Sequence, residues 1–217
     1  MTPQPQIYVV LEIGNGDAAT ATRLALEAVL SAAPVSSLMM RPAAGGALKA
    51  HFVKPLVDLC QRQGVAVLIA DDAALARLVK ADGVHVSWGP DLVKRTQAAR
   101  GDLGARAVVG ADAGRSRDDA MSLGEAGADY VAFGIPAHVE DRATAQVRQL
   151  DLIAWWAEIF EVPCVALDVA SADQAHQLAG LGADFIALTV SDQTSAADAK
   201  KRAQEFADAI SAAEAPA

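Results

Sequence analysis

The sequence predicts a single (β/α)8 barrel, the TIM-barrel fold of the α/β class. Eight runs of strand-forming residues alternate with eight segments of helical periodicity over 217 residues, a common length for such a barrel. Three similar stretches, at 80–86, 126–134 and 180–188, also recur roughly 50 residues apart. Each one leads from the end of a helix through a small or glycine-rich turn and an aspartate into a strand. Such a recurrence is typical of a repeating α/β unit.

The strand candidates are continuous apolar runs, as expected for parallel strands that are covered on both faces. They lie at 7–12, 35–40, 65–70, 83–86, 107–111, 130–133, 164–168 and 185–188. The intervening helices are expected at 18–32, 47–63, 73–80, 92–100, 118–126, 147–160, 172–181 and 196–212. Asp17, Asp71, Ser116 and Ser171 stand at positions where side chains cap helix N-termini.

No linker rich in proline or glycine divides the chain, so we expect one barrel domain over 1–211 and a flexible tail over 212–217. A doubly wound open sheet is the alternative architecture. It requires a reversal of strand order that a sequence does not reveal. The count of eight strand–helix units favours the closed barrel.

Composition excludes several classes of protein. The chain is 53% hydrophobic, which favours a large core, and its net charge of −9 argues against nucleic acid or an anionic membrane as a partner. No apolar run is long enough to span a membrane, and the polar start does not resemble a signal peptide. Cys60 and Cys164 lie in apolar contexts that are typical of buried thiols. We therefore expect a cytoplasmic protein.

Active sites of (β/α)8 barrels form at the carboxyl ends of the strands. An acidic ring with a few cations is expected there, and it could hold Mg²⁺ and a small phosphorylated molecule. Its members are Glu12, Arg41, Asp71 with Asp72, His85, Asp112, the loop 134–142, Asp168, and Ser191 with Asp192. Asp71 or Asp72 could equally cap the next helix. By contrast, the aspartates of the repeat (Asp82, Asp129 and Asp184) precede strands, so a structural role in turns is expected for them.

The roles of two histidines and of two adjacent tryptophans leave alternatives open. His85 is interpreted either as a hydrogen-bonded core residue, which is the favoured view, or as an acid–base group; His138 lies in a loop from which it could reach a ligand. Trp155 and Trp156 follow one another on an apolar helix. They pack this helix on the barrel or form the interface of a homodimer.

The chain resembles the thiamine phosphate synthase and TenI family, whose members are single (β/α)8 barrels. The resemblance is strongest from Val65 to Leu188. It rests on five pieces in order: 68–72 (LIADD), 81–86 (ADGVHV) followed by Asp91-Leu92, Val109-Gly110, 126–134 (AGADYVAFG) and 162–167 (VPCVAL). Any single piece is common among barrels, whereas their order and spacing indicate this family.

The resemblance implies transfer of a pyrimidine methyl diphosphate onto a thiazole phosphate, with release of pyrophosphate and with Mg²⁺ as cofactor. Several family positions differ here: of a Gln-Leu-Arg-Glu-Lys-like signature only Arg41 remains, Asp112 replaces a serine, and Asp168-Val169 replaces a Gly-Gly turn that approaches a phosphate. The resemblance retains Arg41, Asp71 and Asp91 and lets Arg142 replace a lysine. Together with the residues at strand ends and in the loop 134–142, the predicted site contains catalytic Arg41, His138 and Arg142, substrate-binding His85, Asp112, Asp168 and Ser191, and the metal ligands Asp71 and Asp91.

Three functions follow as hypotheses. The first is a thiamine phosphate synthase whose active site is eroded. The second is a TenI-type isomerase in which His138 is the acid–base group. The third is a catalytically silent barrel that binds a small ligand or a protein, because a carboxylate at residue 168 repels a phosphate.

Overall fold

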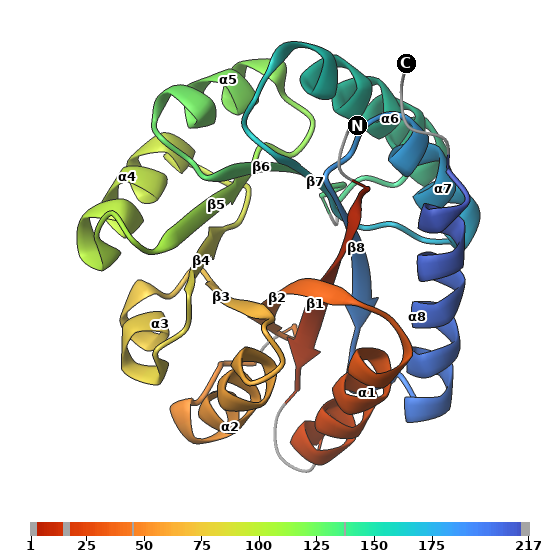
Figure 1. The fold of residues 1–217 in the computed structure, drawn as a ribbon. Helices are drawn as coiled ribbons and strands as arrows, with labels where there is room; N and C mark the ends of the chain where they lie inside the picture. Colours follow the sequence, from red (N-terminus) through yellow and green to blue (C-terminus); the bar gives the residue numbers. More distant parts are fainter. Residues whose placement is uncertain (1–3, 15–17, 45, 137, 214–217) are drawn as a thin grey trace.

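A computed structural model describes residues 4–14, 18–44, 46–136 and 138–213 of the chain. Eight parallel strands close into a barrel in sequence order, and the helices surround it (Figure 1). The strands are β1 (Gln6–Ile13), β2 (Val35–Pro42), β3 (Ala66–Ala70), β4 (Gly83–Val86), β5 (Val108–Asp112), β6 (Tyr130–Phe133), β7 (Cys164–Ala166) and β8 (Phe185–Val190). Because β1 pairs with β8, the sheet has no open edge and the (β/α)8 prediction is confirmed.

The helices are α1 (Ala18–Ala32), α2 (Ala50–Gln61), α3 (Ala73–Val79), α4 (Leu92–Leu103), α5 (Arg117–Glu125), α6 (Arg142–Ile159), α7 (Ala172–Gly180) and α8 (Ala196–Ser211). None of these described helices is both long enough and apolar enough to span a membrane. Residues 214–217 lie outside the described part of the chain, so the predicted division into a barrel and a tail stays a prediction.

Several boundaries differ from the sequence prediction, and two of the differences bear on the site. Helix α6 begins at Arg142 rather than at 147, because the side chain of Asp141 accepts a hydrogen bond from the Thr144 amide and starts the helix there. Strand β7 ends at Ala166, so Asp168 lies in the loop that follows it. Arg142 is therefore the first residue of helix α6 and does not belong to the preceding loop.

The capping predictions are resolved in the same way. Ser116 and Ser171 cap α5 and α7 as expected. At α3 the cap is Asp72, whose Oδ1 accepts from the Leu75 amide, and not Asp71. Asp17 lies outside the described residues. The correction at α3 leaves Asp71 available for another role.

The core has two parts. Alternate residues of a strand point to opposite faces, so Ile7, Val9 and Leu11 pack under the helices while Tyr8 and Val10 point into the barrel. The interior cluster comprises Tyr8, Val10, Met39, Leu68, Ala70, Tyr130, Ala132, Val165, Leu167 and Ala187. These side chains fill the barrel below the carboxyl ends of its strands, and two of them carry hydroxyl groups.

The repeated aspartates join neighbouring strands at the amino-terminal end of the barrel. The Oδ2 atoms of Asp82, Asp129 and Asp184 accept hydrogen bonds from the amides of Val67, Val109 and Cys164, at 2.7, 2.7 and 2.8 Å. Each carboxylate thus satisfies a backbone donor near the start of an adjacent strand. The predicted structural role of the three aspartates is confirmed.

Replacing Asp184 with alanine is expected to lower the free energy of unfolding by roughly 1–3 kcal/mol, because the amide of the buried Cys164 loses its acceptor. Urea unfolding monitored by circular dichroism measures this change. The exposed Asp151 on α6 supplies the matched control, and Asp151→Ala should leave stability nearly unchanged. Equal stabilities of the two variants would contradict the role of the Asp184 carboxylate.

The two adjacent tryptophans of α6 have different surroundings. Trp156 is completely buried, stacks on Phe160 at 4.0 Å between ring centroids, and donates from Nε1 to the Val162 carbonyl. Trp155 is half-buried, and the Arg117 guanidinium lies 4.6 Å from its ring centroid. Packing on the barrel thus accounts for Trp156. A homodimer through α6 stays a prediction, to which Trp155 rather than Trp156 would contribute contact area.

Candidate active site

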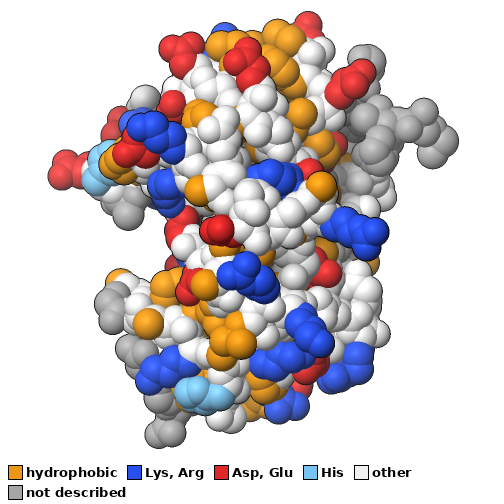
Figure 2. Space-filling model, turned by 90° about the vertical axis from the view of Figure 1, so that its left-hand side faces the viewer, with side chains coloured by type: hydrophobic (Ala, Val, Ile, Leu, Met, Phe, Trp, Pro, Cys, Tyr) orange, Lys and Arg blue, Asp and Glu red, His pale blue; other side chains and the backbone are white. Residues whose placement is uncertain are grey.

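A cavity of about 720 Å³ lies at the carboxyl ends of the strands, where the fold predicts an active site. In the side view of Figure 2 the surface is hollowed at its left edge, and both acidic and basic side chains border the recess. Six of the nine predicted site residues line the cavity: Arg41, His85, Asp112, His138, Arg142 and Asp168. Met39, Ser87, Trp88, Ile135, Pro136 and Leu167 complete the lining.

Arg41 is held at the cavity by an acidic neighbour on the adjacent strand. Glu12 and Arg41 are partners in the register of β1 and β2. Glu12 Oε1 accepts from both Nε and Nη2 of Arg41, at 3.0 and 2.7 Å. About a third of each side chain stays exposed, so the ion pair orients the guanidinium without removing it from solvent. Arg41 can therefore still bind an anion.

His85 lies at the floor of the cavity, at the end of a hydrogen-bonded chain of two tyrosines that the sequence analysis did not single out. Its Nδ1 is 2.8 Å from the hydroxyl oxygen of Tyr130, which is 2.9 Å from that of Tyr8. All three side chains are buried, with at most 6% exposed. Burial lowers the pKa of His85 to about 4, so the ring is neutral at pH 7. The interpretation as a hydrogen-bonded core residue is confirmed, although one side of the ring borders the cavity.

The position of Tyr130 depends on a glycine in the neighbouring strand. A Cβ atom at Gly110 would lie 1.9 Å from Cζ of Tyr130, so only glycine allows the phenol to cross β5. A tyrosine at an inward position of an otherwise apolar strand, next to a strand glycine, is the signal that could have identified this residue from the sequence.

Two carboxylates of the cavity lining flank Gly134. Asp112 Oδ1 accepts from the amides of Gly114 and Gly134, at 2.7 and 3.1 Å, and Asp168 Oδ2 accepts from the amide of Ile135 at 2.8 Å. Burial, with a further contribution from the charge of Asp168, raises the pKa of Asp112 to about 7, although the two backbone hydrogen bonds oppose this shift. Backbone donors that could bind an anion here are thus engaged by the protein's own carboxylates.

Asp112 is expected to make the protein less stable as the pH rises. Its pKa is 3.8 ordinarily and about 7 in the folded protein. Between these values the folded protein keeps a proton that the unfolded chain releases, so stability present below pH 3.8 is lost progressively up to about pH 7. Asp112→Asn keeps an acceptor oxygen but removes the titration. Urea unfolding between about pH 4 and 8 should show a weaker decline for this variant.

The matched control for this measurement is Asp151→Asn, which changes an exposed carboxylate far along α6. We expect this control to follow the parent protein across the pH range. If Asp112→Asn shows the same decline as the parent, the raised pKa of Asp112 is refuted.

The mouth of the cavity carries an aromatic pair. Trp88, 44% exposed, lies with its ring centroid 5.8 Å from that of the exposed His138. Gly114 has a positive φ of 59°, and a Cβ atom there would be 2.7 Å from the indole of Trp88. Only glycine therefore lets the backbone pack this closely against the ring. Arg142 Nη1 donates to the Ile135 carbonyl at 3.1 Å. Trp88 was not among the predicted site residues.

The predicted metal ligands lie outside the cavity lining. Asp71 Oδ1 accepts from the amide of Ser87 at 2.9 Å and from Arg95 Nη2 at 2.6 Å, and Asp91 forms an exposed ion pair with Lys94 at 3.2 Å. Both aspartates adopt positive φ angles. Among the described residues, no group of three or more His, Cys, Asp or Glu side chains is arranged to hold a metal ion.

Ser191 also lies outside the lining, in the loop after β8. Its amide donates to the Thr194 hydroxyl at 3.1 Å, and its own hydroxyl accepts from the Gln193 amide at 3.3 Å. Ser191 thus organises its loop, and its role in substrate binding stays a prediction.

A buried amide supports the cavity from outside the barrel. Gln149 of α6 donates from Nε2 to the carbonyls of Phe133 and Leu167, both at 2.6 Å, and so joins the ends of β6 and β7. Gln174 of α7 in turn donates to Gln149 Oε1. A glutamine within a helical pattern usually indicates an exposed position, so sequence reasoning missed this network.

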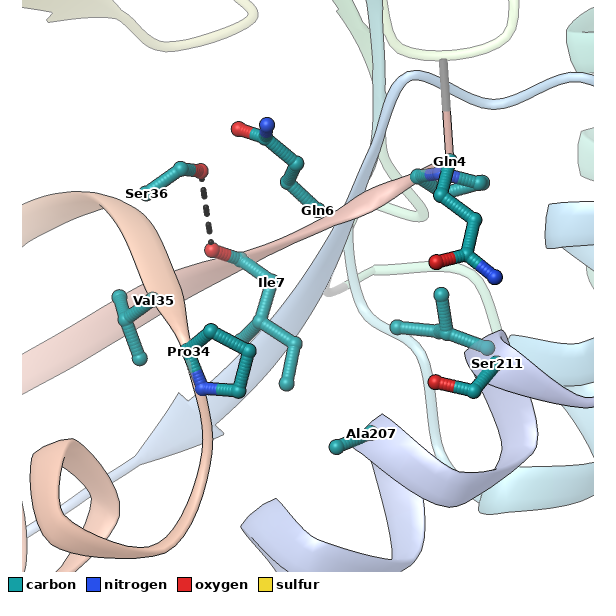
Figure 3. Close-up of a pocket in the computed structure, with 10 residues that line it drawn as sticks. Gln4, Gln6, Ile7, Pro34, Val35, Ser36, Ala207 and Ser211 are labelled. Carbon is teal, nitrogen blue, oxygen red and sulfur yellow. Dashed lines mark hydrogen bonds between the residues drawn. The ribbon is translucent and has the colours of Figure 1, made fainter. Parts of the chain in front are cut away.

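A second cavity, of about 440 Å³, lies at the opposite end of the barrel, near the starts of β1 and β2 and the end of α8. Figure 3 shows its polar side chains, Gln4, Gln6, Ser36 and Ser211, with Ser36 donating to the Ile7 carbonyl. None of its ten lining residues is ionisable. Because the first cavity has ionisable side chains in its lining and the second has none, the first cavity is the candidate active site.

Comparison with known proteins agrees with this location. The family model described as thiamine monophosphate synthase matches residues 7–191, from β1 to just past β8. The chain belongs to this family. A relative named thiamine-phosphate synthase, from Erythrobacter litoralis, is 40% identical to this chain over 166 residues, which cover 76% of each protein. One of the same name from Hyphomonas neptunium is 36% identical over 192 residues, covering 86% of this chain and 85% of the relative.

Solved structures extend the likeness of the fold. A thiamine phosphate pyrophosphorylase from Pyrococcus furiosus superposes with a TM-score of 0.71 at 20% identity, covering 95% of both chains. Tryptophan synthase from Mycobacterium tuberculosis gives a TM-score of 0.70 at 14% identity, over 95% of this chain and 93% of that one. Since the two carry different names, such structural likeness shows the barrel alone. Membership of the thiamine monophosphate synthase family rests on the sequence matches.

Proposed function

We propose that this protein is a transferase of thiamine biosynthesis that joins a pyrimidine methyl diphosphate to a thiazole phosphate and releases pyrophosphate. The observation that carries the proposal is that a member of this family brings Arg41 and Arg142 to one cavity at the carboxyl end of its barrel. Two guanidinium groups suit the binding of a diphosphate, because they donate paired hydrogen bonds to phosphate oxygens and remain charged at all relevant pH values.

In the proposed reaction the bond between the methylene carbon and the diphosphate oxygen breaks, and the thiazole nitrogen forms a bond to that carbon. Negative charge develops on the departing diphosphate. Arg41 and Arg142 would stabilise this charge, and the cavity would orient the two substrates toward one another. No proton has to be transferred in the bond-forming step. Arg41 is the residue best oriented for this task because Glu12 fixes its guanidinium.

Mg²⁺ is the cofactor that we propose for this reaction. It usually binds through one or two carboxylates together with substrate phosphates and water. Asp71 and Asp91, which follow the neighbouring strands β3 and β4 and lie outside the cavity lining, are the carboxylates that would hold it: both bonds to Asp71 end on Oδ1, and Asp91 is mostly exposed. When bound, Mg²⁺ would neutralise charge on the diphosphate. Removal of divalent ions with a chelator should then suppress turnover.

A second candidate function is a catalytically silent barrel that binds a ligand, and one observation favours it. Asp112 and Asp168 occupy the backbone amides of Gly134 and Ile135 beside the cavity, so these donors are not available to a substrate phosphate, and the Asp168 carboxylate adds negative charge to the site. An eroded site of this kind would bind a diphosphate at the arginines without joining it to the thiazole.

A coupled assay separates the two candidates. Purified protein is incubated with the pyrimidine diphosphate, the thiazole phosphate and Mg²⁺, and both pyrophosphate and the thiazolium product are quantified. The transferase predicts equal amounts of the two products. If concentrated enzyme forms no product while the diphosphate with Mg²⁺ still raises the melting temperature, the protein is a binder and the transferase proposal is wrong.

A cytoplasmic location is a further part of the proposal. Cys60 and Cys164 are both free and buried, as expected for thiols of a reducing cytoplasm. Thiol labelling without denaturant should therefore modify neither residue quickly.

A further inference from the structure

A chain of hydrogen bonds from Tyr8 through Tyr130 to His85 indicates which ring nitrogen of His85 carries the proton. The bonds run in a chain, from Tyr8 to Tyr130 at 2.9 Å and from Tyr130 to His85 Nδ1 at 2.8 Å. Each hydroxyl has one proton to donate. The chain can therefore be oriented in two ways, either from Tyr8 toward His85 or from His85 toward Tyr8.

The burial of Tyr8 distinguishes these orientations. If His85 donated from Nδ1, Tyr130 would donate to Tyr8, and the Tyr8 proton would need a further acceptor. The bond recorded for the Tyr8 hydroxyl is the one to Tyr130, and only 1% of Tyr8 is exposed. An orphaned buried hydroxyl proton is unfavourable. If Tyr8 donates to Tyr130 and Tyr130 donates to Nδ1, all three groups are satisfied.

The remaining nitrogen of His85 reaches the cavity. No fully buried side-chain nitrogen or oxygen of the described residues is without a hydrogen-bond partner. The bond recorded for the ring of His85 uses Nδ1, and the residue lines the cavity. Nε2 is therefore the atom that a ligand would meet.

We infer that Tyr130, whose hydroxyl is bonded in turn to Tyr8, is the positioning residue that holds His85 in the tautomer with its proton on Nε2. The neutral ring then presents a hydrogen-bond donor to the cavity and has no free lone pair with which to act as a base there. This inference rests on the proposed function for its ligand, a substrate acceptor atom such as a diphosphate oxygen or a heterocycle nitrogen. It assigns His85 to binding and orientation and removes it from proton abstraction.

Nitrogen NMR tests the tautomer in the unmodified protein. A two-bond ¹⁵N–¹H correlation spectrum at neutral pH distinguishes protonated from unprotonated ring nitrogens, and the signal of His85 among the four histidines is the one absent from His85→Gln. We expect Nε2 protonated and Nδ1 unprotonated. A proton on Nδ1 would overturn the inference, whatever the protein catalyses, so failure of the proposed function does not obscure this result.

The two tyrosines should differ in this spectrum. Tyr8→Phe leaves the Tyr130 hydroxyl able to donate to Nδ1, so the tautomer should persist. Tyr130→Phe removes that donor, and the Nδ1 signal should shift or split between tautomers. An unchanged His85 spectrum in a folded Tyr130→Phe protein would contradict the chain of donation. Circular dichroism establishes that each variant is folded.

Kinetics test the consequence for the substrate. A glutamine side chain can place its amide N–H near the position of Nε2, whereas an asparagine side chain reaches only toward Nδ1. His85→Gln should therefore keep a kcat/KM roughly three- to tenfold higher than that of His85→Asn, the usual effect of one neutral hydrogen bond. Equal loss in both variants would refute the donor role of Nε2.

Discussion

Arg41→Ala should lower kcat/KM for diphosphate transfer by roughly 10²–10³-fold, because it removes a positioned charge that stabilises the departing diphosphate. Glu12 holds the guanidinium from the neighbouring strand, with both hydrogen bonds ending on one carboxylate oxygen. The loss should fall mainly on kcat, since the charge on the leaving group is greatest in the transition state. Steady-state pyrophosphate release measures both constants.

Two variants make this result specific. Arg41→Lys keeps the charge but not the paired donors and should lie between the parent and the alanine variant. Arg23→Ala breaks an exposed ion pair with Glu27 on α1 and should leave turnover unchanged. The expected loss of kcat/KM for Arg41→Ala is at least about 10²-fold. A loss of less than about twofold would show that the guanidinium has no part in the reaction.

Trp156→Ala is expected to destabilise the fold by about 3–5 kcal/mol, the usual cost of removing a fully buried large aromatic side chain. The indole stacks on Phe160, contacts Phe133 edge-on at 5.9 Å and satisfies the Val162 carbonyl. In a chain of 217 residues this corresponds to a drop in Tm of roughly 6–20 °C, which differential scanning calorimetry measures.

The control for this variant lies on the same helix. Ile159 is 59% exposed, and Ile159→Ala should change stability by no more than about 0.5 kcal/mol. If Trp156→Ala instead lowers Tm by less than about 2 °C, the buried packing of α6 against the barrel is disproved.

The barrel could be predicted from the sequence because its signals are local. A continuous apolar strand, a helix of period 3.6 and a turn between them are encoded within a few residues of one another. Asp82, Asp129 and Asp184 could be assigned to the structural end of the barrel for the same reason: their position before a strand determines which end they occupy. Their amide partners at Val67, Val109 and Cys164 required the pairing of strands.

The candidate site was predictable in part. Arg41, Asp112 and Asp168 stand at or just past strand ends, and the fold rule brought them to one cavity. The sequence did not indicate that Asp71 bonds to Arg95, since these residues lie 24 positions apart and meet only where the loop after β3 comes beside α4. Nor did it indicate Gln149, whose helical position resembles a solvated one.

The sequence by itself determined the closed eight-unit barrel, the end at which its chemistry takes place and the family to which the chain belongs. The tertiary structure decided what each site residue contacts. Tyr8 and Tyr130 are 122 residues apart, and the hydrogen-bonded chain from Tyr8 through Tyr130 to His85 exists only because the barrel closes and turns three inward-facing side chains toward one axis. Contacts between residues far apart in sequence determine the burial of a side chain and the direction of its hydrogen bonds. Burial and hydrogen bonding in turn determine its protonation state, which the neighbouring residues in the sequence do not reveal.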